Sequence, residues 1–194
     1  MSPQFKKYKD LSLAELNSAL LESCRLDKLN DVTYLLTSNE LSCNAQISHD
    51  DDICFRKACE YGNLKIVEYL TTSNDLVRKA NIHAQYEDGF RWAATRGHLE
   101  IVRFLLTSPK LKKHSNVHAV GDDAFIYACF HGKLEMIKYL SSDPELKEHA
   151  RIDTKDCLGF RYACQQGEIE VIKYLLTAPR LNGKIDLHAC EDLG

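Results

Sequence analysis

Histidine residues recur at fixed spacing in this chain, and imidazoles held in register are candidates for a metal site. His83, His118 and His188 share one position of a regular pattern, and His114 and His149 share another. A zinc ion requires each imidazole nitrogen at about 2.0–2.1 Å, whereas equivalent residues of neighbouring stacked helices lie roughly 10 Å apart. The spacing therefore argues against a metal site. We expect these side chains to order the segments that connect the helices.

Cysteine offers nucleophilic or disulfide chemistry, and the chain has 8 of them. Cys129 and His131 stand two residues apart, but residues at that spacing on a helix face different directions, so we expect no thiolate–imidazole pair. One position of the pattern is filled by Cys24, Cys59, Cys129 and Cys164. The remaining copy has Ala94 there, and a position shared by cysteine and alanine is small and buried. Neighbouring copies lie beyond the ~7 Å limit for a disulfide. We expect free thiols, which suit a reducing compartment.

Other chemistry is not indicated. The sequence has no glycine-rich phosphate loop, no GxSxG elbow and no CxxC pair, so it predicts neither an enzyme nor a cofactor. The net charge of −3 and the pI near 6.2 give no general attraction to phosphate backbones or anionic membranes. The apolar runs are too short to span a bilayer, and the first residues do not read as a secretory signal. We expect no nucleic-acid partner, no membrane association and a cytoplasmic location.

The element that must position these residues is a repeated helical hairpin. Glycine recurs every 35 residues, at Gly62, Gly97, Gly132 and Gly167, and the residues around it recur as well. The copies follow one another without insertion or deletion, so we expect one continuous array. Its predicted divisions are an N-terminal capping repeat with a short leader at 1–50, repeats at 51–85, 86–120, 121–155 and 156–190, and the start of a further repeat at 191–194.

One copy predicts the structure of the others. Small and apolar residues from Phe90 onward form one face of a short first helix, and Asp88 stands where an N-cap would. Gly97 ends that helix in a left-handed conformation, and a second helix with an apolar stripe follows it. Pro109 then predicts a third, very short helix. Asp123 is the equivalent N-cap candidate in the next copy.

The string GFRWAATRGHLEIVRFLL, from Gly89 to Leu106, resembles the ankyrin repeat, whose helix pair reads TPLHxAAxxGHxxxVxxLL. The resemblance implies an all-α fold: an ankyrin-type helical solenoid of about five stacked helix-turn-helix repeats with short connecting fingers. The family's usual period is 33 rather than 35 residues. We therefore expect added residues after the second helix and a shortened finger. Tetratricopeptide and HEAT arrays share helix pairs but not the glycine-histidine turn.

The resemblance also implies a function, the non-catalytic binding of a partner protein in a concave groove beside the fingers. Residues that stacking requires should recur, whereas residues used for recognition are free to differ. The pair before each glycine differs from copy to copy, and so do the finger residues. The predicted partner-binding residues are Glu60, Tyr61, Tyr86, Glu87, Thr95, Arg96, Asp122, Phe130, His131, Asp156, Gln165 and Gln166. Arrays of near-identical repeats are similar to those of large DNA viruses and host-associated microbes, which implies host proteins as targets and the host cytosol as an alternative location.

The two ends of the array differ. Ser12 and Glu15 match a capping box, which predicts the start of a first helix in the capping repeat. Leu193 and Gly194 are in register with Leu158 and Gly159, so the sequence stops where another first helix would begin. We expect either a longer array or an exposed apolar face. The alternative function is accordingly a structural spacer or self-assembly module acting through this end, with the chain a monomer or weakly self-associating.

Overall fold

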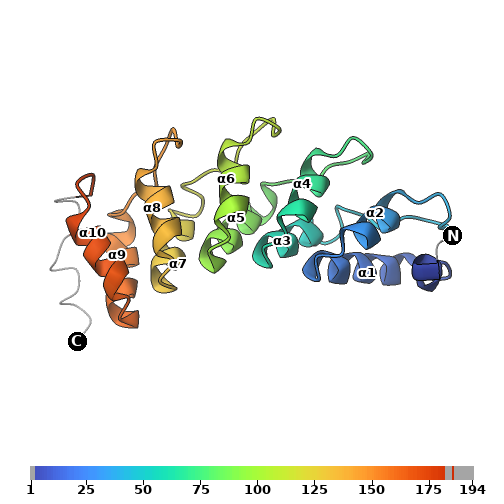
Figure 1. The fold of residues 1–194 in the computed structure, drawn as a ribbon, viewed down its shortest axis with the longest axis horizontal. Coiled ribbons are helices and arrows are strands. Elements are labelled where there is room, and N and C mark those ends of the chain that lie inside the picture. The colour runs from blue at the N-terminus through green and yellow to red at the C-terminus, as the bar shows by residue number, and fades with distance from the viewer. Residues whose placement is uncertain (1–2, 182–184, 186–194) are drawn as a thin grey trace.

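Ten α-helices form five consecutive pairs in the computed structural model, which describes residues 3–181 and 185 of the chain. The first helices of the pairs are α1 (Leu13–Arg25), α3 (Ile53–Glu60), α5 (Ala84–Arg96), α7 (Asp123–Phe130) and α9 (Thr154–Gln166). The second helices are α2 (Leu29–Thr37), α4 (Leu64–Thr72), α6 (Leu99–Thr107), α8 (Leu134–Ser142) and α10 (Ile169–Thr177). The pairs stack in one row from the N-terminus to the C-terminus (Figure 1), and these residues contain no β-strand. The predicted all-helical solenoid is confirmed.

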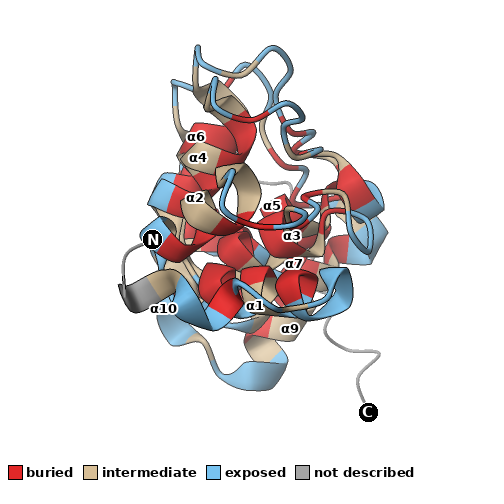
Figure 2. Cartoon of the chain, turned by 90° about the vertical axis from the view of Figure 1, so that its right-hand side faces the viewer, coloured by how far each residue is buried: buried red, intermediate tan, exposed pale blue. Residues whose placement is uncertain are grey.

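The core lies between the two layers of helices. The first helices pack on one another along the whole row. Four of them contribute a buried phenylalanine, Phe55, Phe90, Phe125 or Phe160, and α1 has the buried Leu20 at the same position. The second helices contribute an apolar stripe that includes Val102 and Leu105. Buried residues therefore face the interior of the row, while the connecting loops carry most of the exposed ones (Figure 2). Among the described residues, no helix is long and apolar enough to cross a membrane.

Four of the five first helices, α3, α5, α7 and α9, end at the recurring glycine, as predicted, and Asp27 stands at that position after α1. Gly62, Gly97, Gly132 and Gly167 have φ values between 62° and 84°, a left-handed conformation that costs a side-chain-bearing residue energy. The next residue donates its backbone N–H back across the turn, for example from His98 to the carbonyl of Ala93 at 2.8 Å. This is the Schellman arrangement. It sets the angle between the two helices of every pair.

The start of each first helix differs from the prediction. Three consecutive residues of left-handed backbone precede it, at 50–52, 85–87, 120–122 and 155–157. This left-handed turn stands where the longer finger of the family would be, so it explains how the finger is shortened. Asp88 and Asp123 are not N-caps, because no cap hydrogen bond from either side chain forms and both carboxylates bind basic side chains instead.

The segment after each second helix is a turn rather than the predicted third helix. Ser108 has extended backbone, and its hydroxyl accepts the N–H of Lys110 at 3.3 Å, which closes a turn instead of starting a helix. The chain then returns to the second helix. Ser115 donates its N–H to the carbonyl of Leu105 at 2.9 Å, and the same bond recurs 35 residues earlier and later, from Ala80 and Ala150.

The N-terminal leader folds onto the first repeat. The predicted capping box is present, with the Ser12 N–H donating to Glu15 at 2.8 Å. Ahead of it, the 3-10 helix η1 (Pro3–Tyr8) brings the Tyr8 hydroxyl to 2.6 Å from Asp31 of α2. The leader therefore belongs to the capping repeat. The predictions for His188, Cys190, Leu193, Gly194 and most of the end of the last repeat concern positions outside the described residues.

Candidate functional site

The first helices present the residues that vary between copies. Between the left-handed turn and the glycine, one side of each helix packs on its neighbours and the other side is open. Of the predicted residues, Tyr61, Arg96, His131, Gln165 and Gln166 are exposed at the helix ends, with 46% of Tyr61 accessible. Glu60 and Phe130 are half-buried beside them. We call this open side the first-helix surface.

The finger residues divide into two groups. Tyr86 is 80% exposed and Asp156 is also exposed, each at the middle of a left-handed turn. Glu87 and Asp122 are buried at the third position of such turns, where they accept hydrogen bonds from His83 at 2.6 Å and from His118 at 2.7 Å. These two carboxylates stabilise the turns, and their burial gives no support to the prediction that they extend the binding groove.

Thr95 is also buried, and its hydroxyl donates to the carbonyl of Arg91 at 2.8 Å within α5. It therefore offers no polar atom to an exposed surface. Its small size matters instead, because the side chain lies at the base of a cavity between α5 and α7.

Two residues that line opposite sides of this cavity were not among the predicted partner-binding residues. Trp92 and Tyr127 occupy the same position of α5 and α7, two residues after the recurring phenylalanine, and are 37% and 42% exposed. Lys57 and Tyr162 occupy this position in the neighbouring copies. The position varies between copies just as the predicted pair does. Variation two residues after the recurring phenylalanine was therefore the signal that could have identified this position as part of the site.

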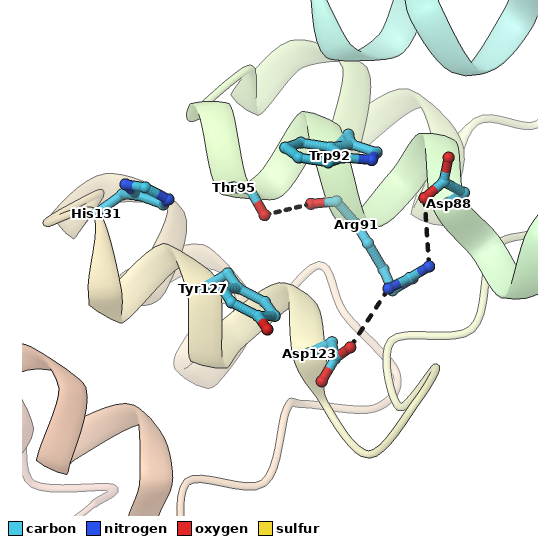
Figure 3. Close-up of a pocket in the computed structure, with 7 residues that line it drawn as sticks. All are labelled: Asp88, Arg91, Trp92, Thr95, Asp123, Tyr127 and His131. Atoms are coloured by element: carbon cyan, nitrogen blue, oxygen red, sulfur yellow. Dashed lines mark hydrogen bonds and ion pairs between the residues drawn. The ribbon is translucent and has the colours of Figure 1, made fainter.

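The cavity has a volume of about 340 Å³ and is lined by Asp88, Arg91, Trp92, Thr95, Asp123, Tyr127 and His131. Trp92 and Tyr127 form opposite walls of the space (Figure 3). Asp88, Arg91 and Asp123 lie together at one end, and His131 lies at the other. Arg96 covers the ring of Trp92, with its guanidinium carbon 5.3 Å from the ring centroid.

The end of the cavity at Asp88 and Asp123 is a chain of alternating charges that links four successive first helices, α3, α5, α7 and α9. Arg91 binds Asp88 and Asp123 at 3.3 Å each, Arg56 binds Asp88 at 3.0 Å, and Lys155 binds Asp123 at 2.8 Å. Each carboxylate therefore has two cationic partners. Arg56 and Arg91 occupy the same position of successive copies, and both bind Asp88.

The other end of the cavity holds His131 between the cationic side chains of Arg96 and Lys133 and the carboxylate of Glu168. Burial lowers the pKa of His131, and the nearby charges of Lys133 and Arg96 lower it further, against a smaller opposing effect of Glu168. The stem of Lys133 packs over Gly97, which places this lysine next to the end of α5. Arg96 has an ion pair with Glu60 at 3.3 Å. Lys133 has no acidic side chain within 4.0 Å in the part of the chain that the structure describes.

The histidines and cysteines have structural roles where the structure describes them. The ring nitrogens of His114 and His149 lie 2.9 Å and 2.8 Å from the carbonyls of Ser108 and Asp143, across the turns after the second helices. These two histidines, like His83 and His118 at the left-handed turns, therefore order the connecting segments, as predicted. Across residues 3–181 and 185, no cluster of three histidine, cysteine or acidic side chains could hold a metal ion.

The recurring cysteine position is buried at Cys24, Cys59 and Cys129, whose thiols are free. Burial raises the pKa of the Cys129 thiol well above its ordinary value, so this thiol stays protonated at neutral pH. A nucleophilic cysteine requires the opposite shift. The environment of Cys129 therefore opposes the pairing with His131 that its sequence position could suggest.

Comparison with known proteins agrees with the helical hairpins described above. The family model described as ankyrin repeats (3 copies) matches residues 56–156 and again residues 90–189. The two overlapping matches together span well over half of the chain. No curated protein matches it.

Proposed function

The chain belongs to the ankyrin repeat family, and from this premise we propose that it binds a partner protein, without catalysis, through its first-helix surface. Members of the family are generally protein–protein interaction modules, and they are typically non-catalytic. The proposal concerns the place of binding. The groove formed by the first helices and the left-handed turns is the proposed concave surface.

The observation that carries the proposal is the exposure of large aromatic side chains at variable positions. Tyr61, Trp92 and Tyr127 are partly open to solvent on successive first helices, although the repeat requires none of them for its core. Aromatic and arginine side chains are enriched among the residues that dominate binding energy. Stacked helices hold these side chains at fixed spacing, which reduces the conformational entropy lost on association.

A combined variant tests the proposal: Tyr61→Ala, Arg96→Ala, Phe130→Ala and His131→Ala in one chain. The matched control removes two exposed ion pairs of the second helices, through Glu135→Ala, Lys138→Ala, Glu170→Ala and Lys173→Ala. Both chains should keep the wild-type helical circular dichroism. Proteins captured from a lysate by the wild-type chain and by the control, but not by the first-helix variant, are the expected result. Equal capture by all three would exclude this surface.

A structural spacer or self-assembly module is the competing function. Such a module would associate with other copies as concentration rises, and the first-helix variant would not alter that association. Sedimentation velocity over a range of concentrations therefore separates the two functions. Association that survives in the variant, together with unchanged capture, would favour self-assembly.

We also propose that the chain acts in a reducing compartment, the cytosol of its own cell or of a host. The free thiols of Cys24 and Cys59, both buried in the core, support this proposal. A cytosolic fraction that contains the intact protein would be the expected result of cell fractionation. Recovery from an oxidising compartment would contradict it.

A further inference from the structure

The cavity between α5 and α7 exists because a small residue replaces a large one. Thr95 occupies in α5 the position that Phe130 occupies in α7. In the gap between α7 and α9, the ring of Phe130 packs edge-on against the ring of Tyr162, with the centroids 5.3 Å apart. The centroid of the Tyr127 ring lies 6.5 Å from that of Tyr162. One repeat earlier, Thr95 leaves that space empty. The array therefore has an unfilled aromatic slot at its centre.

The walls of the slot suit an apolar side chain. Trp92 and Tyr127 both remain partly exposed to solvent, so an apolar group placed between their rings would remove three apolar surfaces from water at once. The volume of about 340 Å³ lies at the lower end of the range for ligand pockets, which fits one large side chain rather than an extended ligand.

The charges around the slot determine which charged groups of the partner can lie next to that apolar side chain. At one end, Asp88 and Asp123 already bind three cations, Arg56, Arg91 and Lys155, so a cationic partner group would meet a net positive cluster. At the other end stand Arg96, His131 and Lys133. Within the described residues their acidic neighbours are Glu60, which is paired with both Lys57 and Arg96, and Glu168. Taken together, the two ends of the slot carry more cationic than acidic side chains, which favours an acidic flanking segment.

We propose that this slot is the anchor site for an acidic segment of the partner protein: a large apolar side chain enters between Trp92 and Tyr127, and an adjacent carboxylate binds the basic end formed by Arg96, His131 and Lys133. The proposal rests on the proposed function and specifies the chemistry of the partner.

The chain carries its own reporter for this site, because Trp92 is its single tryptophan. The probe is the peptide acetyl-Glu-Glu-Phe-Glu-Glu-amide, titrated while the emission of Trp92 is recorded. One control peptide replaces the phenylalanine by alanine, and another replaces the four glutamates by lysines. We expect a saturable change with the first peptide and at least about 10-fold weaker binding of both controls.

Two variants locate the binding. Thr95→Phe copies the neighbouring repeat and should fill the slot, whereas Thr95→Ser keeps the cavity and the hydroxyl. Lys133→Glu reverses one charge at a half-buried site without touching the core. We expect Thr95→Phe and Lys133→Glu each to weaken the acidic peptide about 10-fold or more, and Thr95→Ser to leave it unchanged.

Equal binding of the three peptides, or no saturable response of Trp92 to the phenylalanine peptide, would overturn the inference. Full binding by both Thr95→Phe and Lys133→Glu would also overturn it. Its failure differs from failure of the proposed function. If captured proteins are lost from the four-residue first-helix variant but retained by Thr95→Phe and Lys133→Glu, the surface binds a partner by other contacts and the anchor site is wrong.

Discussion

Lys155 donates a hydrogen bond across a repeat boundary to the backbone carbonyl of Val120, at 3.0 Å. Val120 starts the left-handed turn ahead of α7, and a β-branched residue is strained in that conformation. In the preceding copy, Arg91 binds the carbonyls of the equivalent turn from its own helix. The copy that contains Val120 has the buried Ile126 in place of that arginine. The lysine of the next repeat therefore replaces the missing guanidinium.

Removal of this lysine should destabilise the array. Lys155→Met keeps the aliphatic stem but takes away the donor to Val120 and the ion pair with Asp123, which lie at 3.0 Å and 2.8 Å. Because the ammonium is partly exposed, we expect a loss of about 1 kcal/mol in the free energy of unfolding. Urea denaturation followed by circular dichroism measures it. Lys173→Met, which breaks an exposed pair with Glu170, is the control and should change stability by less than about 0.5 kcal/mol.

The packing of neighbouring first helices gives a second prediction. A Cβ atom added to Gly89 would lie 2.7 Å from the ring of Phe55 and 3.1 Å from the sulfur of Cys59. Gly89→Ala should therefore cost about 1–3 kcal/mol through overpacking. At the next boundary, the positions equivalent to Cys59 and Gly89 hold Ala94 and Ala124, so a smaller residue at the first position accompanies a Cβ atom at the second. Cys59→Ala should therefore recover part of the stability lost in Gly89→Ala. A double-mutant cycle with no coupling between the two changes would refute this packing relationship.

The capping glycines provide a third prediction, because two of them differ in surroundings but not in conformation. Gly62 has a φ of 81° and its added Cβ would meet the ring of His98 at 2.6 Å, whereas Gly167 has a φ of 72° and open space around it. Gly167→Ala should cost about 1 kcal/mol from backbone strain alone. Gly62→Ala should cost more, because the clash also disturbs the contact of His98 with the Glu60 carbonyl at 2.9 Å. Equal losses in thermal denaturation would mean that the His98 contact contributes nothing.

Much of the fold could be predicted because the features that define it recur. The 35-residue period, the left-handed glycines and the buried phenylalanines each appear in several copies, so one copy supports the reading of the next. The left-handed turns could not be predicted, because their residues differ in every copy. The turn at 50–52 is three aspartates, whereas the turn at 85–87 is glutamine, tyrosine and glutamate. Their carbonyls also accept hydrogen bonds from different side chains, from Arg56 and Arg91 of the following helix in two copies and from Lys155 of the next repeat in a third.

The candidate site was predicted only in part for a related reason. Variation between copies identified the end of each first helix, where Tyr61 and His131 are exposed, but variation alone does not distinguish open positions from buried ones. Thr95 and Asp122 vary although both are buried. The cavity depends on a comparison of two gaps, in which Thr95 and Phe130 fill different volumes. That comparison requires knowing which helices face each other.

The charge at the basic end of the slot predicts how binding depends on pH. The groups that face His131 are Arg96 from α5, Lys133 from the turn before α8, and Glu168 from the turn before α10. Burial and the two cations lower the pKa of His131 below its ordinary value of 6.5, so the free ring is neutral at pH 7.

A peptide carboxylate held beside the ring would favour the imidazolium, so binding should be accompanied by proton uptake. Affinity for acetyl-Glu-Glu-Phe-Glu-Glu-amide should therefore rise as pH falls from about 7.5 to about 5.5, before the glutamates protonate near ~4.3. We expect an increase of about 3-fold in the titration of Trp92 emission, and a flat profile for His131→Gln. A slope that persists in His131→Gln would assign the proton to another group, and a flat profile in the wild-type chain would place the carboxylate elsewhere.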